Sequence, residues 1–179
     1  MLVESRTFQM DTITGIPTHP LVVHLPVVLI PLATIGVLLM AARQGLYQRY
    51  RWEVLAVGFV GMLGSILAAS SGEELEHQIG EAEGREAVRA IQEHADAGEL
   101  ARTASIVFFV ILAGWVLLPW FGRRLQARAA ADDAGARTMP TWLNPALTVL
   151  VVIAALAATG SVIVAGHSGA AQVWESLAG

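Results

Sequence analysis

The chain has 179 residues, no cysteine and a formal net charge of −4 at pH 7. The absence of cysteine excludes disulfides, iron–sulfur ligation, thiolate zinc sites and covalent c-type haem attachment. Its eleven basic residues are all arginines, and their dispersion along an acidic chain argues against nucleic-acid binding. Apolar residues make up 55% and charged residues only 15% of the sequence, so much of the chain is expected to lie in lipid.

Four apolar runs follow one another, and each is long enough to cross a bilayer as a helix. They cover residues 21–42, about 52–71, 103–121 and 143–166. The start of the chain lacks the basic segment and apolar core of a cleavable signal peptide. We therefore predict an all-α, polytopic membrane four-helix bundle over residues 19–169, with an extracytoplasmic N-terminal segment of residues 1–18 and an interfacial tail of residues 170–179.

The arginines predict the orientation of this bundle. Seven of the eleven lie in the loops after the first and third runs, whereas twelve of the fifteen acidic residues lie on the other side. Because arginine-rich loops stay in the cytoplasm, both termini and the 72–102 loop are expected outside, in a bacterial cytoplasmic membrane. The seven arginines are Arg43, Arg49, Arg51, Arg123, Arg124, Arg128 and Arg137.

The 72–102 loop is the longest polar segment, and its acids are expected to form a solvated face. Residues 82–97 have helical spacing of apolar side chains. They predict either a short extracytoplasmic interfacial helix or an N-terminal extension of the third span, bent at Gly98. Residues 129–138 are expected to form a flexible cytoplasmic linker.

Small residues line the second and fourth spans. Gly58, Gly61 and Gly64 recur at three-residue intervals, which predicts close approach of another helix. The alternative is that such a stripe makes room for a flat cofactor. Pro26 and Pro31 predict a kinked first span beside a polar or cofactor-filled cavity. The alternative is an ordinary kinked helix, because proline is common in membrane spans.

All five histidines fall on the predicted extracytoplasmic side, and each span brings at least one of them. Imidazole is the commonest metal ligand at neutral pH and the usual axial ligand of haem b. His24 is a candidate in its own right, because an ionisable side chain within a span is costly. The alternative is that these side chains only form hydrogen bonds at helix ends. The five are His19, His24, His77, His94 and His167.

The run His19-Pro20-Leu21-Val22-Val23-His24-Leu25-Pro26 resembles the opening of a bacterial membrane family known as domain of unknown function 2231. Further matching segments are Gly72-Glu73 with His77, His94-Ala95 with Gly98, and Gly166-His167-Ser168-Gly169. The resemblance covers about residues 15 to 175 and implies four spans. Some relatives are joined to Rieske-type or cytochrome domains, which implies a redox setting.

These observations favour a haem b site with His24, His77 and His167 as ligands. Such a protein would act in electron transfer, with a quinone or a periplasmic carrier as partner. The first alternative is a zinc, copper or non-haem iron site that uses His19, His94 and Glu73. The second is a cofactor-free accessory subunit of a larger membrane complex or a homodimer. No motif of a hydrolase or transferase is visible, and at least three imidazoles are expected within about 10–12 Å of a common point.

Overall fold

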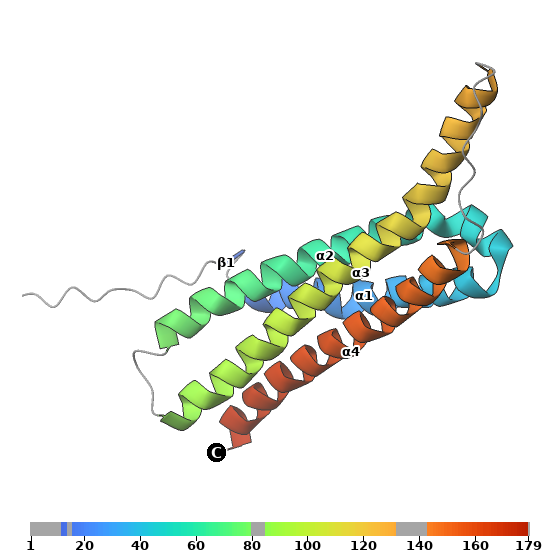
Figure 1. Ribbon diagram of the computed structural model, residues 1–179. Coiled ribbons are helices and arrows are strands. Elements are labelled where there is room, and N and C mark those ends of the chain that lie inside the picture. The colour runs from blue at the N-terminus through green and yellow to red at the C-terminus, as the bar shows by residue number, and fades with distance from the viewer. Residues whose placement is uncertain (1–11, 14–15, 80–84, 132–142, 179) are drawn as a thin grey trace, which may run out of the picture.

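Four helices form a bundle in the computed structural model (Figure 1). They are α1 (Thr18–Ala42), α2 (Gln44–Ile79), α3 (Arg85–Ala131) and α4 (Leu143–Ala178). A short antiparallel pair of strands, β1 (Thr12–Ile13) and β2 (Ile16–Pro17), precedes α1. The structure describes residues 12–13, 16–79, 85–131 and 143–178, with side chains for 22–70, 92–128 and 144–171.

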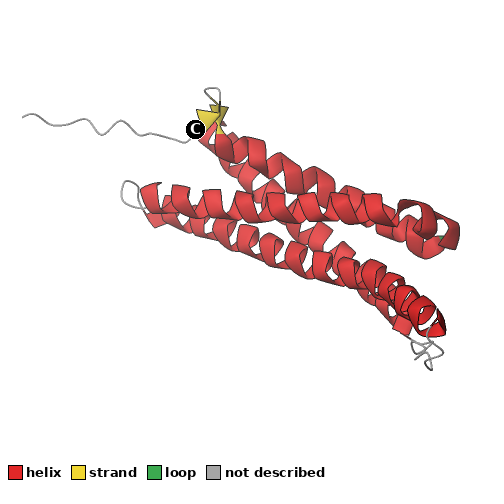
Figure 2. Ribbon diagram, turned by 90° about the horizontal axis from the view of Figure 1, so that it is seen from above, coloured by secondary structure: helices red, strands yellow, loops and turns green. Residues whose placement is uncertain are grey.

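All four helices are long and apolar enough to cross a membrane, which confirms the predicted four-span bundle. Figure 2 shows that the described chain is helical almost throughout. Each of α1 and α3 packs against both α2 and α4. Arg43 alone separates α1 from α2, and its carbonyl accepts the backbone N–H groups of Leu46 at 2.9 Å and Tyr47 at 3.2 Å. This tight turn makes α1 and α2 antiparallel neighbours.

The helices extend beyond the apolar runs. From Arg85 onward, the helical spacing expected over 82–97 belongs to α3, which continues through Gly98 without a break. This part of the chain is therefore an extension of the third span. In the same way α4 continues into the segment expected as an interfacial tail and ends at Ala178. Of the expected linker, residues 132–138 lie outside the described residues.

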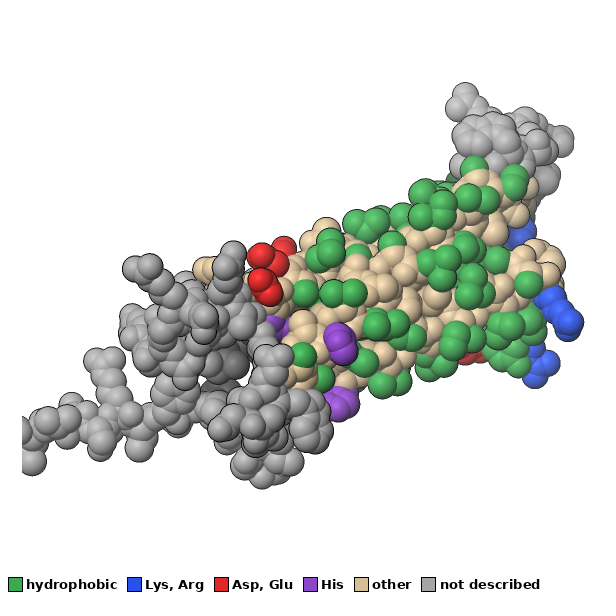
Figure 3. Space-filling view, turned by 90° about the horizontal axis from the view of Figure 1, so that it is seen from below, with side chains coloured by type: hydrophobic (Ala, Val, Ile, Leu, Met, Phe, Trp, Pro, Cys, Tyr) green, Lys and Arg blue, Asp and Glu red, His purple; other side chains and the backbone are tan. Residues whose placement is uncertain are grey.

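The outer surface of the bundle is apolar. Only 22–33% of each candidate span is buried within the protein, and Val28, Val110 and Val149 are 57%, 62% and 60% exposed. Lipid accounts for this surface, since a soluble monomer rarely exposes such large apolar patches. Arginines gather at one end of the surface and histidines near the other (Figure 3). The arginine-rich end is defined by Arg43, Arg49, Arg51, Arg123, Arg124 and Arg128, and the histidine end by His24, His94 and His167.

The glycines of α2 bring its backbone close to α1. A Cβ atom on Gly64 would lie 2.7 Å from Leu25 Cβ and 3.0 Å from Pro26 Cδ. On Gly61 it would lie 2.9 Å from Ile30 Cδ1. Along this contact the stripe is a helix-packing surface, as its spacing predicts, and Pro26 is buried against α2.

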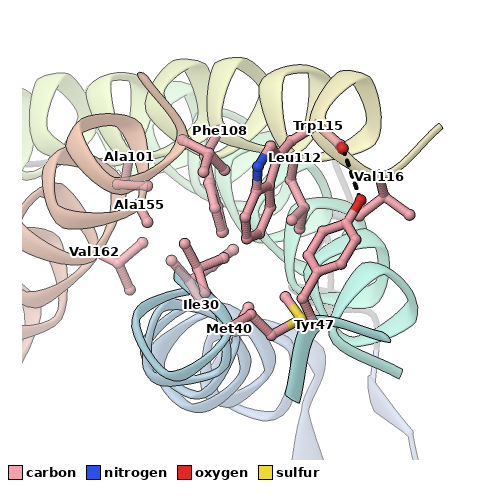
Figure 4. Packing of buried hydrophobic residues seen from close by; sticks show 14 residues of the cluster. Ile30, Met40, Tyr47, Ala101, Phe108, Leu112, Trp115, Val116, Ala155 and Val162 are labelled. Atoms are coloured by element: carbon pink, nitrogen blue, oxygen red, sulfur yellow. Dashed lines mark hydrogen bonds between the residues drawn. The ribbon is translucent and has the colours of Figure 1, made fainter. Parts of the chain in front are cut away.

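Apolar side chains from all four helices fill the centre of the bundle (Figure 4). Phe108 and Leu112 of α3 are fully buried there, together with Ile30 of α1 and Val151 of α4. Small residues of α4 allow this close packing, since Ala155 and Ala158 are also fully buried. The core is therefore built by side chains that interdigitate between helices.

Short polar side chains join the helices inside this core. Thr34 of α1 donates to the Ala155 carbonyl of α4 at 3.1 Å, so its oxygen can accept from the Thr159 hydroxyl, 2.8 Å away. Ser65 of α2 donates to Ser105 of α3 at 3.0 Å. Interhelical hydrogen bonds of this kind stabilise helix association where no water competes for them.

Pro119 interrupts the hydrogen bonding of α3 near the arginine-rich end. Because proline has no N–H, the Trp115 carbonyl four residues earlier loses its helical partner. The Tyr47 hydroxyl of α2 donates to this carbonyl at 3.0 Å (Figure 4). The two rings also pack edge to face, with centroids 4.9 Å apart. A side chain of α2 thus satisfies the backbone group that the proline leaves open, as lipid surroundings require.

Replacing Tyr47 by Phe should lower the free energy of unfolding by about 1–3 kcal/mol, because the Trp115 carbonyl loses its donor. The loss should be smaller in a Pro119→Ala background, where the N–H gained at position 119 can bond to the same carbonyl. Unfolding of the purified protein in detergent, followed by tryptophan fluorescence, measures both.

Tyr50→Phe is the control, because Tyr50 is exposed and its hydroxyl has no hydrogen-bond partner among the described residues. This substitution should leave the free energy of unfolding nearly unchanged. Equal losses for Tyr47→Phe with and without Pro119 would contradict the proposed repair of the helix.

Candidate functional site

The histidine end brings His94 of α3 into contact with the last turns of α4. Nδ1 of His94 lies 2.9 Å from Oγ of Ser168, and the two side chains are half-buried. Ser168 follows His167 directly within the Gly166-His167-Ser168-Gly169 segment. The serine of this segment, which the sequence analysis did not select, is therefore the residue that contacts a second predicted site histidine.

The hydrogen bonds of Ser168 indicate which ring nitrogen of neutral His94 carries the proton. Ser168 has one hydroxyl hydrogen and donates it to the Ala165 carbonyl at 3.0 Å. With this hydrogen on the carbonyl, the serine oxygen can accept from Nδ1 of His94, so the Nδ1–H tautomer with its lone pair on Nε2 allows both hydrogen bonds. No group within the described part of the chain forms a hydrogen bond with Nε2 of His94. In this arrangement the Nε2 atom can accept a hydrogen bond or a proton.

Gly169 sets how close the imidazole ring lies to α4. A Cβ atom at this position would lie 2.9 Å from Cε1 and 3.4 Å from Nε2 of His94. Any larger residue would push the ring away from Ser168. Ser168 and Gly169 together fix both the hydrogen bond and the plane of the ring.

His24 and His167 are exposed side chains on the neighbouring helices α1 and α4. A Cβ atom on Gly166 would lie 3.5 Å from Cγ2 of Val27, which brings the two helices together close to both histidines. His24 comes one turn before Val27 and His167 directly follows Gly166, so they lie within about one helical turn in depth.

The remaining candidates are placed by their backbone alone. His19 lies in the first turn of α1, and Glu73 and His77 lie near the end of α2. All three side chains fall outside the described residues. Among the side chains that are described, no three His, Asp or Glu residues form a group that could hold a metal ion. The expected convergence of three imidazoles stays a prediction.

Acidic side chains surround His94 on its own helix. Glu93 and Asp96 are exposed on either side of it, and Glu99 pairs with Arg102 at 2.6 Å. None of the described carboxylates forms a hydrogen bond with the imidazole, whose described partner is the Ser168 hydroxyl. The acids of this helix fit the interpretation as a solvated face.

A family model described as "Predicted membrane protein (DUF2231)" matches residues 15–179. The chain belongs to this family. Neither the curated proteins nor the solved structures contain a match to it. The DUF2231 match confirms the resemblance drawn from the segments at 19–26 and 166–169. Together with the four candidate spans, it identifies the chain as an integral membrane protein.

In this DUF2231 protein, Ser168→Ala should shift neutral His94 from the Nδ1–H towards the Nε2–H tautomer, because Nδ1 loses its acceptor. Imidazole ¹⁵N chemical shifts of the labelled protein in detergent measure the tautomer, with His94→Ala to assign the signals. His167→Gln, which removes an exposed neighbour, should leave the His94 signals in place. A predominant Nε2–H tautomer in the unsubstituted protein would contradict the assignment.

Proposed function

We propose that this membrane protein binds a metal cofactor through imidazoles at its histidine end, with haem b as the first candidate and His94 as the best-positioned ligand. The observation that carries this proposal is the 2.9 Å contact between Nδ1 of His94 and Oγ of Ser168, because the Nδ1–H tautomer that fits it leaves a lone pair on Nε2. Metal-binding histidines almost always donate their other ring N–H to a polar group, and Ser168 accepts that bond here.

The pair His24 and His167 supports a second position for ligands at the same end. Both side chains are exposed, and the contact between Val27 and Gly166 holds their helices together. Haem iron can accept imidazoles from two different helices on opposite sides of the ring plane. His77, the third ligand expected from the sequence, remains part of this proposal.

Bound haem b would supply one-electron redox chemistry. The protein would then serve as an electron-transfer subunit, and a quinone or a soluble periplasmic carrier is the partner class that fits. A zinc, copper or non-haem iron ion bound by His94 with His19 and Glu73 is the alternative cofactor. An accessory subunit of a larger complex, or a homodimer, without any cofactor is the remaining alternative.

His94→Ala should lower the bound cofactor at least about tenfold. Ser168→Ala should weaken its binding by about 10–100-fold, because the Ser168 hydroxyl orients the His94 ring. The protein is purified after expression with a haem precursor, and the Soret band and the metal content are measured together. Gln92→Ala is the matched control, since Gln92 is exposed one half-turn before His94 on the same helix.

A Soret band that disappears in His94→Ala supports haem bound at this residue. A Soret band that is lost only in His24→Ala or His167→Ala would place the haem at the histidine pair of α1 and α4. Stoichiometric zinc or copper without a Soret band would show that the cofactor is the alternative metal ion and not haem. Protein that holds neither haem nor metal overturns the proposal in favour of the accessory subunit.

We further propose that the histidine end faces the extracytoplasmic side of a bacterial cytoplasmic membrane. The support is the concentration of arginines at the opposite end, where positively charged loops remain in the cytoplasm. Both chain termini would then be extracytoplasmic. The possession of four spans is compatible with either orientation, so this proposal needs its own experiment.

A fluorescent reporter fused after Arg128 should be active in the cytoplasm, and an alkaline phosphatase reporter fused after Glu93 should be active in the periplasm. The two reporters exchanged between the same positions are the controls and should both be silent. Phosphatase activity after Arg128 would reverse the orientation and place the histidine end in the cytoplasm.

A further inference from the structure

A polar pocket lies at the arginine-rich end, at the opposite end of the bundle from His94. It has a volume of about 70 Å³ and is lined by residues of all four helices. Its polar wall contains Gln44 of α2, Arg123 of α3, and Asn144 and Thr148 of α4. At about 10–15 Å³ for each water-sized position, this volume holds several water molecules or one tetrahedral anion.

Hydrogen bonds make the inner wall of the pocket rigid. Tyr47 donates to the Trp115 carbonyl, and Trp115 Nε1 donates to the Thr148 hydroxyl at 3.0 Å. Thr148 in turn donates to the Asn144 carbonyl at 2.9 Å. Figure 4 shows Met40, Tyr47 and Trp115 on this side of the core. The hydroxyl and indole donors are therefore already used within the wall.

Three other donor side chains in the lining form no hydrogen bonds of this kind. No acceptor among the described residues takes a hydrogen bond from the guanidinium of Arg123 or from the side-chain amides of Gln44 and Asn144. They come from three different helices and line one space, and all three residues are exposed, so water can reach them. A group that accepts several hydrogen bonds could replace this water.

The electrostatic surroundings favour an anion. Arg123 lines the pocket and no carboxylate does, while Glu53, the described acid in this half of α2, is exposed. The guanidinium of Arg51 lies 6.0 Å from the centre of the Tyr47 ring, and its buried Nε has no hydrogen-bond partner among the described residues. Asn144 lies in the first turn of α4, where backbone N–H groups add partial positive charge.

Aromatic side chains indicate the depth of the pocket in the membrane. Trp52 and Trp120 pack edge to face with centroids 5.8 Å apart, and Arg124 lies 4.1 Å from the centre of the Trp120 ring. Tryptophan and arginine are typical of the level of the lipid headgroups. The pocket therefore opens where lipid phosphates and dissolved anions are both within reach.

We propose that this pocket binds a phosphate-bearing anion, held by the Arg123 guanidinium and by the side-chain amides of Gln44 and Asn144. A guanidinium can form two parallel hydrogen bonds with phosphate oxygens. The two amides add hydrogen-bond donors beside the guanidinium. Contact with a bilayer surface of zwitterionic lipids would not need such a set of donors. The same chemistry is offered by the headgroup of an acidic phospholipid and by inorganic phosphate. This proposal is independent of any cofactor at the histidine end.

Native mass spectrometry of the detergent-solubilised full chain tests the proposal with phosphatidylglycerol, phosphatidylcholine and inorganic phosphate as probes. Phosphatidylglycerol or inorganic phosphate should bind at least about tenfold more tightly than phosphatidylcholine, and Arg123→Gln should weaken that binding about tenfold, which corresponds to about 1.4 kcal/mol. Asn144→Ala should weaken it by about threefold, less than Arg123→Gln, because it removes an uncharged, solvent-exposed donor and leaves the guanidinium in place.

Arg128→Gln is the matched control, because it removes the same charge from an exposed position of α3 outside the pocket. It should change binding less than twofold, and circular dichroism should show that each variant keeps its helices. Phosphatidylglycerol that inorganic phosphate cannot displace identifies a lipid headgroup, whereas efficient displacement identifies free phosphate. Equal losses for Arg123→Gln and Arg128→Gln, or equal binding of phosphatidylcholine, would overturn the proposal.

Discussion

Water is absent from the surroundings of most of this bundle, so polar groups deep in the spans depend on partners within the protein. The constraint is clearest at Pro119, which leaves the Trp115 carbonyl open until the Tyr47 hydroxyl of another helix reaches it at 3.0 Å. Because Trp115 also donates to Thr148, the same repair links α2, α3 and α4. A backbone defect thus becomes a contact that holds three helices in register and shapes one wall of a pocket.

Close packing between the helices also stabilises their association. Lipid is as apolar as the helices, so there is little hydrophobic gain when two spans meet. Gly61 and Gly64 compensate by letting the backbone of α2 approach α1, and Thr34 and Ser65 add interhelical hydrogen bonds deeper in the core. Stability therefore depends on small residues and short polar side chains, while the large apolar side chains outside remain available to lipid.

The two ends of the bundle offer opposite chemistry. Imidazoles at the histidine end provide lone pairs, and His94 is already oriented by Ser168 and Gly169. Guanidinium and amide groups at the arginine-rich end provide donors, and Tyr47 and Trp115 fix the wall beside them. The proposed cofactor site and the proposed anion site therefore lie at opposite ends of the bundle. The apolar core of about one membrane thickness separates the two, so each can be altered without direct contact with the other.

The sequence by itself determined the four spans, their small-residue contacts and the family, because length, hydropathy and residue size act locally along a helix. It also placed the histidines at one end, since the ends of successive antiparallel helices alternate. Only the tertiary structure decided which residues of the 166–169 segment face a partner. Adjacent helical residues point about 100° apart, so Ser168 rather than His167 contacts His94. The pairing of Tyr47 with Trp115 likewise joins residues far apart in the chain, and no local pattern encodes the rotation of one helix against another.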